Sequence, residues 1–304
     1  MNSKECSMPE DIKKLWKDRD RVIRAMTTNG LFRVAVMRST VLSRLAQEKH
    51  ELGPLESLML TRALTGASLM ASFLKGEERV TITLEGDGEI SMVYAEAMQV
   101  GEVRGYCRRN PQTAGAADSP LGNGLLKVQR VIYNSFEPVT GVVALRKGDV
   151  TSDLSYYLTQ SEQIPSVVII DVAYDDAHVV RQSAGLMLQA MPGATNEDIF
   201  KTYDALDYLG NLTGYLDEGM TLEDLALKVM PSEATIMAST AADFFCRCSI
   251  DRFKSALLML GLDEVEDMQR EGHHELVCQY CNSHYKLSEQ DFAEMIEQLM
   301  AQRN

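Results

Sequence analysis

Four of the six cysteines in this 304-residue chain fall in two close pairs near the C-terminus. Cys246 and Cys248 form a C-x-C pair, and Cys278 and Cys281 form a C-x-x-C pair after 29 intervening residues. Four thiolates from two short loops, each about 2.3 Å from the ion, make the tetrahedral site that Zn²⁺ prefers. The pairs could also close as disulfides, and the small ring of a C-x-C disulfide would be somewhat strained. The pattern predicts one Zn²⁺ per chain and a candidate redox group.

Other residues near the pairs could take part. His273, His274 and His284 lie close by in the sequence, and any of them could replace one sulfur as a ligand. We expect them at the surface or behind the ligands, because two cysteine pairs already complete an all-thiolate site. Cys6 and Cys107 have no close partner in the sequence, and we interpret them as a tail thiol and a strand thiol.

Composition and charge narrow the class of protein. An apolar fraction of 45% and a charged fraction of 24% are those of an ordinary globular protein. Residues 196–304 hold 8 Lys/Arg and 21 Asp/Glu, whereas residues 1–195 hold 22 and 23, so nearly all of the net charge of −14 lies in the C-terminal third. A zinc module that grips phosphates is usually basic, so we expect no nucleic-acid partner.

The sequence also indicates the compartment of the cell in which we expect the protein. Its longest apolar-leaning run, 63–74, is shorter than the roughly 20 residues that span a bilayer. The first fourteen residues are polar and charged, unlike the apolar core of a signal peptide. We therefore expect no membrane association and a cytoplasmic protein, in which clustered cysteines indicate metal or redox chemistry.

The first two-thirds of the chain predicts an α+β fold with a mostly antiparallel sheet, because strand patterns follow one another and are joined by short turns. Ser7 and Glu10 form a possible capping box for an early helix. Further helices are expected at 22–26, 40–51, 54–74 and 150–160, and strands at 31–37, 80–85, 89–96, 103–107, 125–133, 141–145, 166–173 and 178–188.

A helical connector follows. Thr195 caps a helix that begins at Asn196, and a second helical segment covers 221–230. Composition alone favours a stable wall of the main domain. However, Gly210 and Gly214 each cost about 1 kcal/mol relative to alanine inside a helix, and acidic charge is concentrated here. We therefore expect the connector to be marginally stable on its own.

The cysteine region contains two expected helices, at 251–260 and from the capping box Ser288–Asp291 to Met300. Here the sequence resembles the zinc module of the heat shock protein 33 family, the redox-regulated holdase chaperones. Two upstream segments resemble that family's core-domain signatures, so the resemblance covers about residues 18–300. The segments that carry it are Phe245–Phe253, Cys278–Tyr285, Thr83–Gly88 and Gly185–Pro192.

The resemblance implies a core domain over 1–193 with 1–17 as an extension, a metastable linker over 194–240, and a zinc-binding redox-switch domain over 241–304. It implies a non-enzymatic chaperone of the stress response that is inactive when reduced and bound to Zn²⁺. Oxidation would form disulfides between Cys246 and Cys248 and between Cys278 and Cys281, expel zinc and unfold the linker. The expected partners are unfolded client proteins, a second copy in an oxidised homodimer, and ATP-dependent chaperones downstream.

Two other classes of protein remain open from the residues. A thiol-disulfide oxidoreductase would use Cys278 and Cys281 as an exchanging pair, although no thioredoxin-like βαβ pattern surrounds them. A structural zinc-ribbon protein would bind nucleic acid with a steep salt dependence, which the acidic C-terminal third disfavours. No H-E-x-x-H motif or nucleotide-binding loop stands out in the sequence.

Overall fold

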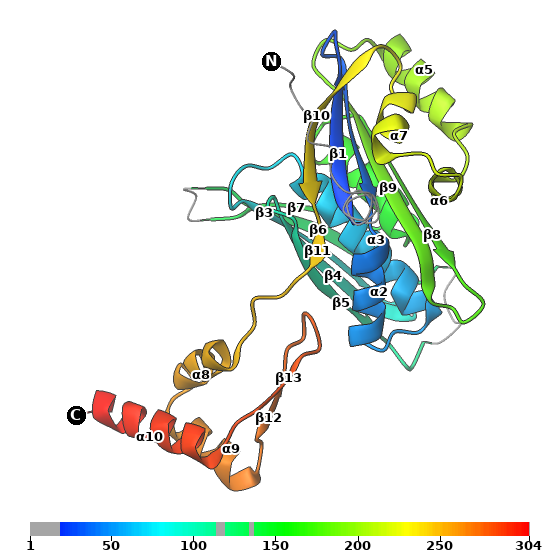
Figure 1. Cartoon of the computed structure of the whole chain (residues 1–304). Coiled ribbons are helices and arrows are strands. Elements are labelled where there is room, and N and C mark those ends of the chain that lie inside the picture. Colours follow the sequence, from blue (N-terminus) through cyan, green and yellow to red (C-terminus); the bar gives the residue numbers. More distant parts are fainter. Residues whose placement is uncertain (1–18, 114–118, 134–136, 304) are drawn as a thin grey trace, which may run out of the picture. The chain divides into compact units, whose positions relative to one another are not determined.

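The computed structural model of the chain describes residues 19–113, 119–133 and 137–303 (Figure 1). Its contacts divide the chain into two compact units, with the division between Phe244 and Phe245. The early helix expected from Ser7, and Cys6 with it, lie outside the described residues. Within the described part of the chain, no helix is long and apolar enough to cross a membrane.

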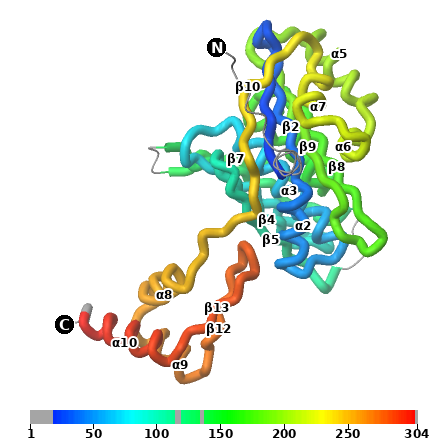
Figure 2. Tube along the Cα trace, viewed as in Figure 1, coloured from blue at the N-terminus to red at the C-terminus, as the bar shows by residue number. Residues whose placement is uncertain are grey.

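The first unit contains an antiparallel five-stranded sheet in the order β10-β1-β2-β9-β8. Strands β1 and β10 are about two hundred residues apart in the sequence, yet they lie side by side (Figure 2). The five strands are β1 (Arg21–Thr27), β2 (Phe32–Arg38), β8 (Ser166–Tyr174), β9 (Val180–Ala190) and β10 (Ala234–Ala241). Because side chains alternate along a strand, this sheet has two different faces to cover.

A second sheet in the same unit has six strands in the order β11-β5-β4-β3-β6-β7. Its strands pair antiparallel, except that the two-residue β11 runs parallel to β5. The strands are β3 (Arg79–Gly86), β4 (Ile90–Met98), β5 (Glu102–Arg109), β6 (Gly124–Val131), β7 (Val139–Ala144) and β11 (Asp243–Phe244). The consecutive pairing explains why alternating segments joined by short turns were readable from the sequence.

Helix α3 (Pro54–Ala71) packs against strands of both sheets, and α2 (Thr40–Lys49) and α4 (Val150–Gln160) lie beside it. Thirteen of the eighteen residues of α3 are buried, as expected for a helix that is apolar all round. Glycines allow its close approach: a Cβ added at Gly185 of β9 would come 2.6 Å from Thr65 of α3. The helix therefore forms the centre of the core.

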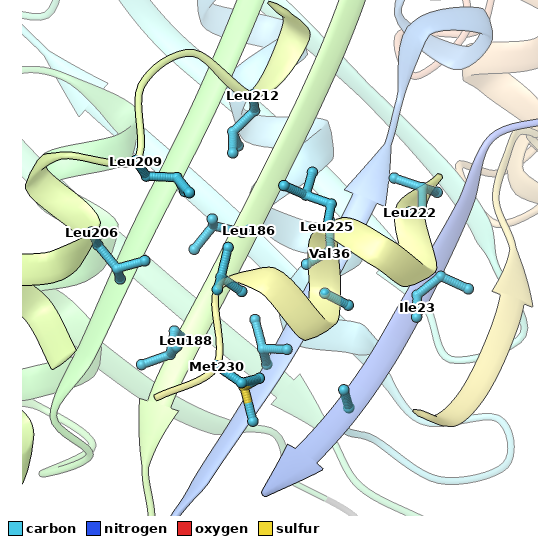
Figure 3. Packing of buried hydrophobic residues seen from close by; sticks show 14 of the residues in the cluster. Ile23, Val36, Leu186, Leu188, Leu206, Leu209, Leu212, Leu222, Leu225 and Met230 are labelled. Atoms are coloured by element: carbon cyan, nitrogen blue, oxygen red, sulfur yellow. The ribbon is translucent and has the colours of Figure 1, made fainter. Parts of the chain in front are cut away.

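The other face of the first sheet is covered by α5 (Asn196–Asp207), α6 (Leu212–Asp217) and α7 (Leu222–Lys228). Figure 3 shows leucines of these helices and their connections pointing at Val36, Leu186 and Leu188 of the sheet. We call this set the cover cluster; its buried members are Ile23, Ala25, Phe32, Val34, Val36, Ala184, Leu186, Leu188, Ala190, Leu206, Leu209, Leu212, Leu222, Leu225, Ala226, Val229 and Met230.

Polar contacts also hold the cover helices. The Thr195 side chain caps α5, as the sequence predicted, and Asp198 completes a reciprocal capping box with it. Both terminal nitrogens of Arg21 in β1 donate to Glu223 of α7, and those of Arg181 donate to Asp217 of α6 at 2.7 and 2.8 Å. Each bidentate pair ties one cover helix to the sheet.

The α+β class is confirmed, and several element predictions need correction. The segment expected as a helix at 22–26 is β1, and the last part of the expected helical linker is β10. Sheet pairing on both sides of β1 overrides local helix preference there. Gly210 does not interrupt a helix; it adopts φ +79° between α5 and α6, a conformation that glycine allows at little cost.

The second unit is a small module of three helices and one hairpin. Its elements are α8 (Ile250–Leu258), α9 (Leu262–Glu271), β12 (Glu275–Val277), β13 (His284–Lys286) and α10 (Glu289–Arg303). Ser288 and Asp291 form the predicted capping box before α10. Its buried apolar cluster consists of Leu257, Leu262, Val265, Leu287, Phe292, Met295 and Leu299. Seven side chains are a small core, so the apolar core alone gives the module a low free energy of unfolding.

Candidate metal centre

The four clustered cysteines come from two short segments of the second unit. Cys246 and Cys248 lie in the extended segment just before α8, and Ser249 caps that helix by accepting a hydrogen bond from the Arg252 N–H. Cys278 and Cys281 lie on the turn that joins β12 to β13. A helix start and a tight hairpin thus present one pair each.

Backbone hydrogen bonds shape the hairpin turn. The Cys278 N–H donates to the Ser283 carbonyl at 2.9 Å, and the Asn282 N–H donates to the Cys278 carbonyl at 2.7 Å. Asn282 has φ +53°, a left-handed conformation that asparagine tolerates better than most residues. The turn therefore holds both thiols on the same side of the hairpin end.

The four sulfur atoms all lie within 4.8 Å of one another. Cys246 Sγ is 3.8 Å from Cys278 Sγ, and Cys248 Sγ is 3.4 Å from Cys281 Sγ. A tetrahedral site with Zn–S bonds of about 2.3 Å has sulfur–sulfur edges of about 3.8 Å. All four are free cysteines rather than disulfides. The geometry therefore suits one metal ion bound by four thiolates.

The four thiols differ in acidity. Burial raises the pKa of Cys278 to about 12, and burial likewise raises the pKa of Cys248. Burial also acts on Cys281, but its hydrogen bonds with the Ser283 side chain and backbone, together with those to Cys248 and Cys278, outweigh burial and bring the pKa of Cys281 to about 7. The Ser283 hydroxyl lies 3.2 Å from this sulfur. Donors near a sulfur stabilise its thiolate form, which is the form that binds metal.

A tyrosine hydroxyl approaches a second sulfur. Tyr285 of β13 places its hydroxyl 3.1 Å from Cys248 Sγ and donates to the Cys248 carbonyl at 3.0 Å. This interaction raises the pKa of Tyr285 to about 12. The ring packs against Phe253 of α8 with centroids 5.3 Å apart, which fixes the hydroxyl beside the site. Tyr285 and Ser283 were not predicted; their only sequence signal is a hydroxyl within four residues of Cys281.

The remaining candidates lie outside this cluster. His284 interacts through Nδ1 with Glu275 at 2.8 Å, and His274 Nδ1 lies 3.3 Å from the Leu287 carbonyl. His273 is exposed, and the group that could hold a metal consists of the four cysteines alone among the described residues. Cys107 lies in β5, where burial and then the charge of Glu56 raise its pKa to about 12.

Fold and site together define a class of protein: an α+β unit with two sheets, followed by a small module built around a four-cysteine centre. Comparison with known proteins agrees with that class. The family model described as Hsp33 protein matches residues 20–288. The crystal structure of the 33 kDa chaperonin from Thermotoga maritima is similar, with a TM-score of 0.83 and 28% identity over 93% of this chain and 99% of that one.

Curated relatives extend the comparison. The 33 kDa chaperonin of Streptococcus agalactiae is 32% identical over 286 residues, covering 91% of this chain and 98% of the relative. That of Bacillus subtilis is 31% identical over 289 residues, covering 92% and 99%. The chain therefore belongs to the Hsp33 family of chaperones, as the resemblance in its sequence indicated.

Proposed function

We propose that this protein is a redox-regulated holdase, which binds unfolding proteins under oxidative stress without ATP and is inactive when reduced. The observation that carries the proposal is the four-sulfur cluster in a unit whose apolar core, among the residues described, is a cluster of seven buried side chains. A module of that size depends on a crosslink for its fold. Removing the crosslink by oxidation would then be a structural event as well as a chemical one.

In the reduced state we assign one Zn²⁺ per chain to Cys246, Cys248, Cys278 and Cys281. Thiolates are soft ligands that select zinc over hard cations, and the sulfur spacing supports four-coordination. When bound, the ion supplies a structural crosslink between the segment before α8 and the hairpin turn. Ser283 and Tyr285 place their hydroxyls against two of the sulfurs and orient them.

Oxidation would remove these ligands. A thiolate attacks a peroxide oxygen, gives sulfenic acid and releases hydroxide; a second thiolate then attacks that sulfur and releases a second hydroxide, leaving a disulfide. We propose that the products join Cys246 to Cys248 and Cys278 to Cys281. In the folded module, sulfurs of different pairs also lie close together, at 3.8 Å for Cys246 and Cys278 and 3.4 Å for Cys248 and Cys281. Once the module unfolds, however, short loops favour pairing within each motif.

Unfolding of the second unit would release the linker from the first sheet. Helices α5 to α7 cover the apolar face of the first sheet, so their release would expose the cover cluster. Two features favour release: the helices are short, and Phe200 of α5 and Tyr208, which follows its last residue, are 71% and 82% exposed. Unfolding proteins expose apolar segments of their own, and an uncovered apolar sheet face would bind them.

The remaining expectations follow from the same proposal. We place the protein in the cytoplasm, where thiols are normally kept reduced, with no catalytic residue of its own. The active, oxidised form is proposed to be a homodimer, and release of clients is assigned to separate ATP-dependent chaperones. The domain limits of 193 and 240 also belong to this proposal, with residues 194–240 as the segment that unfolds.

Light scattering by a heat-denatured client protein tests the proposal. We expect the oxidised, zinc-free protein to suppress aggregation at stoichiometric amounts and the reduced protein to leave it unchanged. Replacing Cys278 and Cys281 with serine should abolish the response to peroxide, whereas Cys107→Ser serves as a matched control and should respond normally. An oxidised protein that fails to suppress aggregation would overturn the proposed function.

A further inference from the structure

Three arginines lie near the face of the first sheet that is opposite to the helices α5 to α7. Two of them belong to that sheet and the third to the second sheet. Arg24 of β1 and Arg33 of β2 point to the face opposite Ile23 and Val34, which belong to the cover cluster. Arg33 pairs with Met26, two residues along β1 from Arg24. Such diagonal neighbours have side chains about 7–8 Å apart at their bases, within reach of two guanidinium groups.

The third arginine comes from the other sheet. Arg130 of β6 pairs with Glu162, which follows α4, at 2.5 Å. Arg33 is partly buried; burial lowers its pKa first, and the positive charges of Arg130 and Arg24 lower it further. Only Glu162 opposes them. Gln189, which accepts a hydrogen bond from Arg33, donates to Ser166 Oγ at 3.0 Å, four residues after Glu162. These bonds hold the segment that carries Glu162, the partner of Arg130, near Arg33 at a junction of the two sheets.

The three arginines carry more positive charge than the one carboxylate beside them can neutralise. The Nε of Arg33 donates to Gln189 Oε1 at 2.9 Å, and its guanidinium lies 4.1 Å from the centre of the Phe73 ring. Within the part of the chain that the structure describes, the terminal nitrogens of Arg33 and the whole guanidinium of Arg24 have no hydrogen-bond or ion-pair partner. The Nε of Arg24 is buried and unsatisfied. Three guanidinium groups against one carboxylate leave a net charge of +2.

Such an arrangement costs free energy, because like charges repel and buried donors lose their water. An arginine on a plain solvated surface would turn away from its neighbours, yet Arg33 is held by stacking on Phe73 and by Gln189. The donors that remain open are planar forks, which match the oxygens of phosphate and carry charge at any physiological pH. A phosphate dianion has the charge that neutralises the cluster.

We propose that Arg24, Arg33 and Arg130 form a binding site for a phosphate dianion, either the free ion or the phosphoryl group of a small molecule. The bound group would bridge β1 and β2 of the first sheet and β6 of the second. It would therefore stabilise the first unit, whose strands β1 and β2 carry cover-cluster residues on their other face. The site does not involve the cysteines and is independent of the redox proposal.

Thermal unfolding of the reduced, zinc-bound full chain tests the site. The melting temperature of the first unit is measured in increasing inorganic phosphate, and separately in adenosine monophosphate, with chloride added to keep ionic strength constant. We expect the temperature to rise with the logarithm of phosphate concentration. A rise with phosphate alone assigns the site to the free ion, and an equal or larger rise with the monophosphate assigns it to a phosphoryl group.

Variants decide whether the rise comes from this cluster. Arg24→Gln and Arg33→Gln should each weaken the apparent affinity roughly tenfold or more, the usual worth of a charged hydrogen bond. Arg79→Gln is the control, because Arg79 is an exposed arginine of β3 on the opposite face of the sheet from Arg130, which pairs with Val80. Arg24→Gln should also raise the melting temperature without phosphate, since repulsion is relieved. No rise beyond the chloride control, or an unchanged rise in both cluster variants, would overturn the proposal.

Discussion

Truncating one buried leucine of the cover helices should loosen the linker and prime the chaperone. Leu225 of α7 is fully buried in the cover cluster, whereas Leu227 on the same helix is 41% exposed. Leu225→Ala removes buried carbon atoms and leaves a cavity, which costs about 2–5 kcal/mol. Leu227→Ala changes an exposed side chain and should cost less than about 1 kcal/mol.

The difference predicts a measurable change in local opening. A loss of at least about 2 kcal/mol corresponds to amide exchange roughly 30-fold faster wherever exchange occurs through release of the helix. Hydrogen exchange with mass spectrometry on the reduced, zinc-bound protein reports this for peptides that cover α5 to α7. Peptides from α3, at the centre of the core, provide an internal reference.

The same samples then go into an aggregation assay without oxidant. Leu225→Ala should suppress aggregation partly while still reduced, and Leu227→Ala should behave as the wild type. Two results would refute the reasoning: equal exchange rates in the two variants, or fast exchange in Leu225→Ala with no gain of activity. The first would mean that Leu225 does not hold the helix, and the second that release of the linker does not expose the client site.

Three further predictions concern the cysteines and their neighbours. In the zinc-bound protein, where Cys248 is a thiolate ligand, Tyr285→Phe removes the hydroxyl 3.1 Å from its sulfur. Because that hydrogen bond stabilises the bound thiolate against attack on peroxide, thiol loss in dilute peroxide should become about fivefold faster in a colorimetric thiol assay, and an unchanged or slower loss would contradict this. Cys107 should resist iodoacetamide at pH 8, because the thiolate reacts and its pKa is raised to about 12; labelling should grow about tenfold per pH unit, and rapid labelling at pH 8 would contradict this. A zinc chelator should abolish the melting transition of the second unit, while a separate transition of the first unit remains at a temperature no higher than before, because its linker is loosened; calorimetry that shows both units lost together would argue against separate stability.

The sequence was most informative where chain neighbours decide the structure. Hairpin-joined strands, the Thr195 cap of α5 and the two cysteine pairs all depend on residues close together in the chain. Residues 22–26 were wrongly assigned to a helix, because their secondary structure depends on pairing with two other strands. One is β2, and the other is β10, which lies about two hundred residues away in the sequence. Long-range pairing leaves little trace in a five-residue stretch.

The residues that surround the metal centre were harder to predict from the sequence. The hydroxyls of Ser283 and Tyr285 reach sulfur only because the hairpin turn and the packing of Phe253 aim them there. The excess positive charge around Arg33 comes from arginines on three strands in two sheets, so no local sequence motif predicts it. Ligand residues can be recognised by their spacing, whereas residues that tune or accompany them depend on the folded geometry.

The central claim is that metal release, thiol oxidation and chaperone activity are one event. It is tested most directly by measuring bound zinc, free thiols and suppression of client aggregation on the same samples during mild peroxide treatment at elevated temperature. The account predicts that one zinc and the four thiols of Cys246, Cys248, Cys278 and Cys281 disappear as suppression appears. Suppression that develops with zinc still bound, or zinc loss with four oxidised thiols and no suppression, would contradict it.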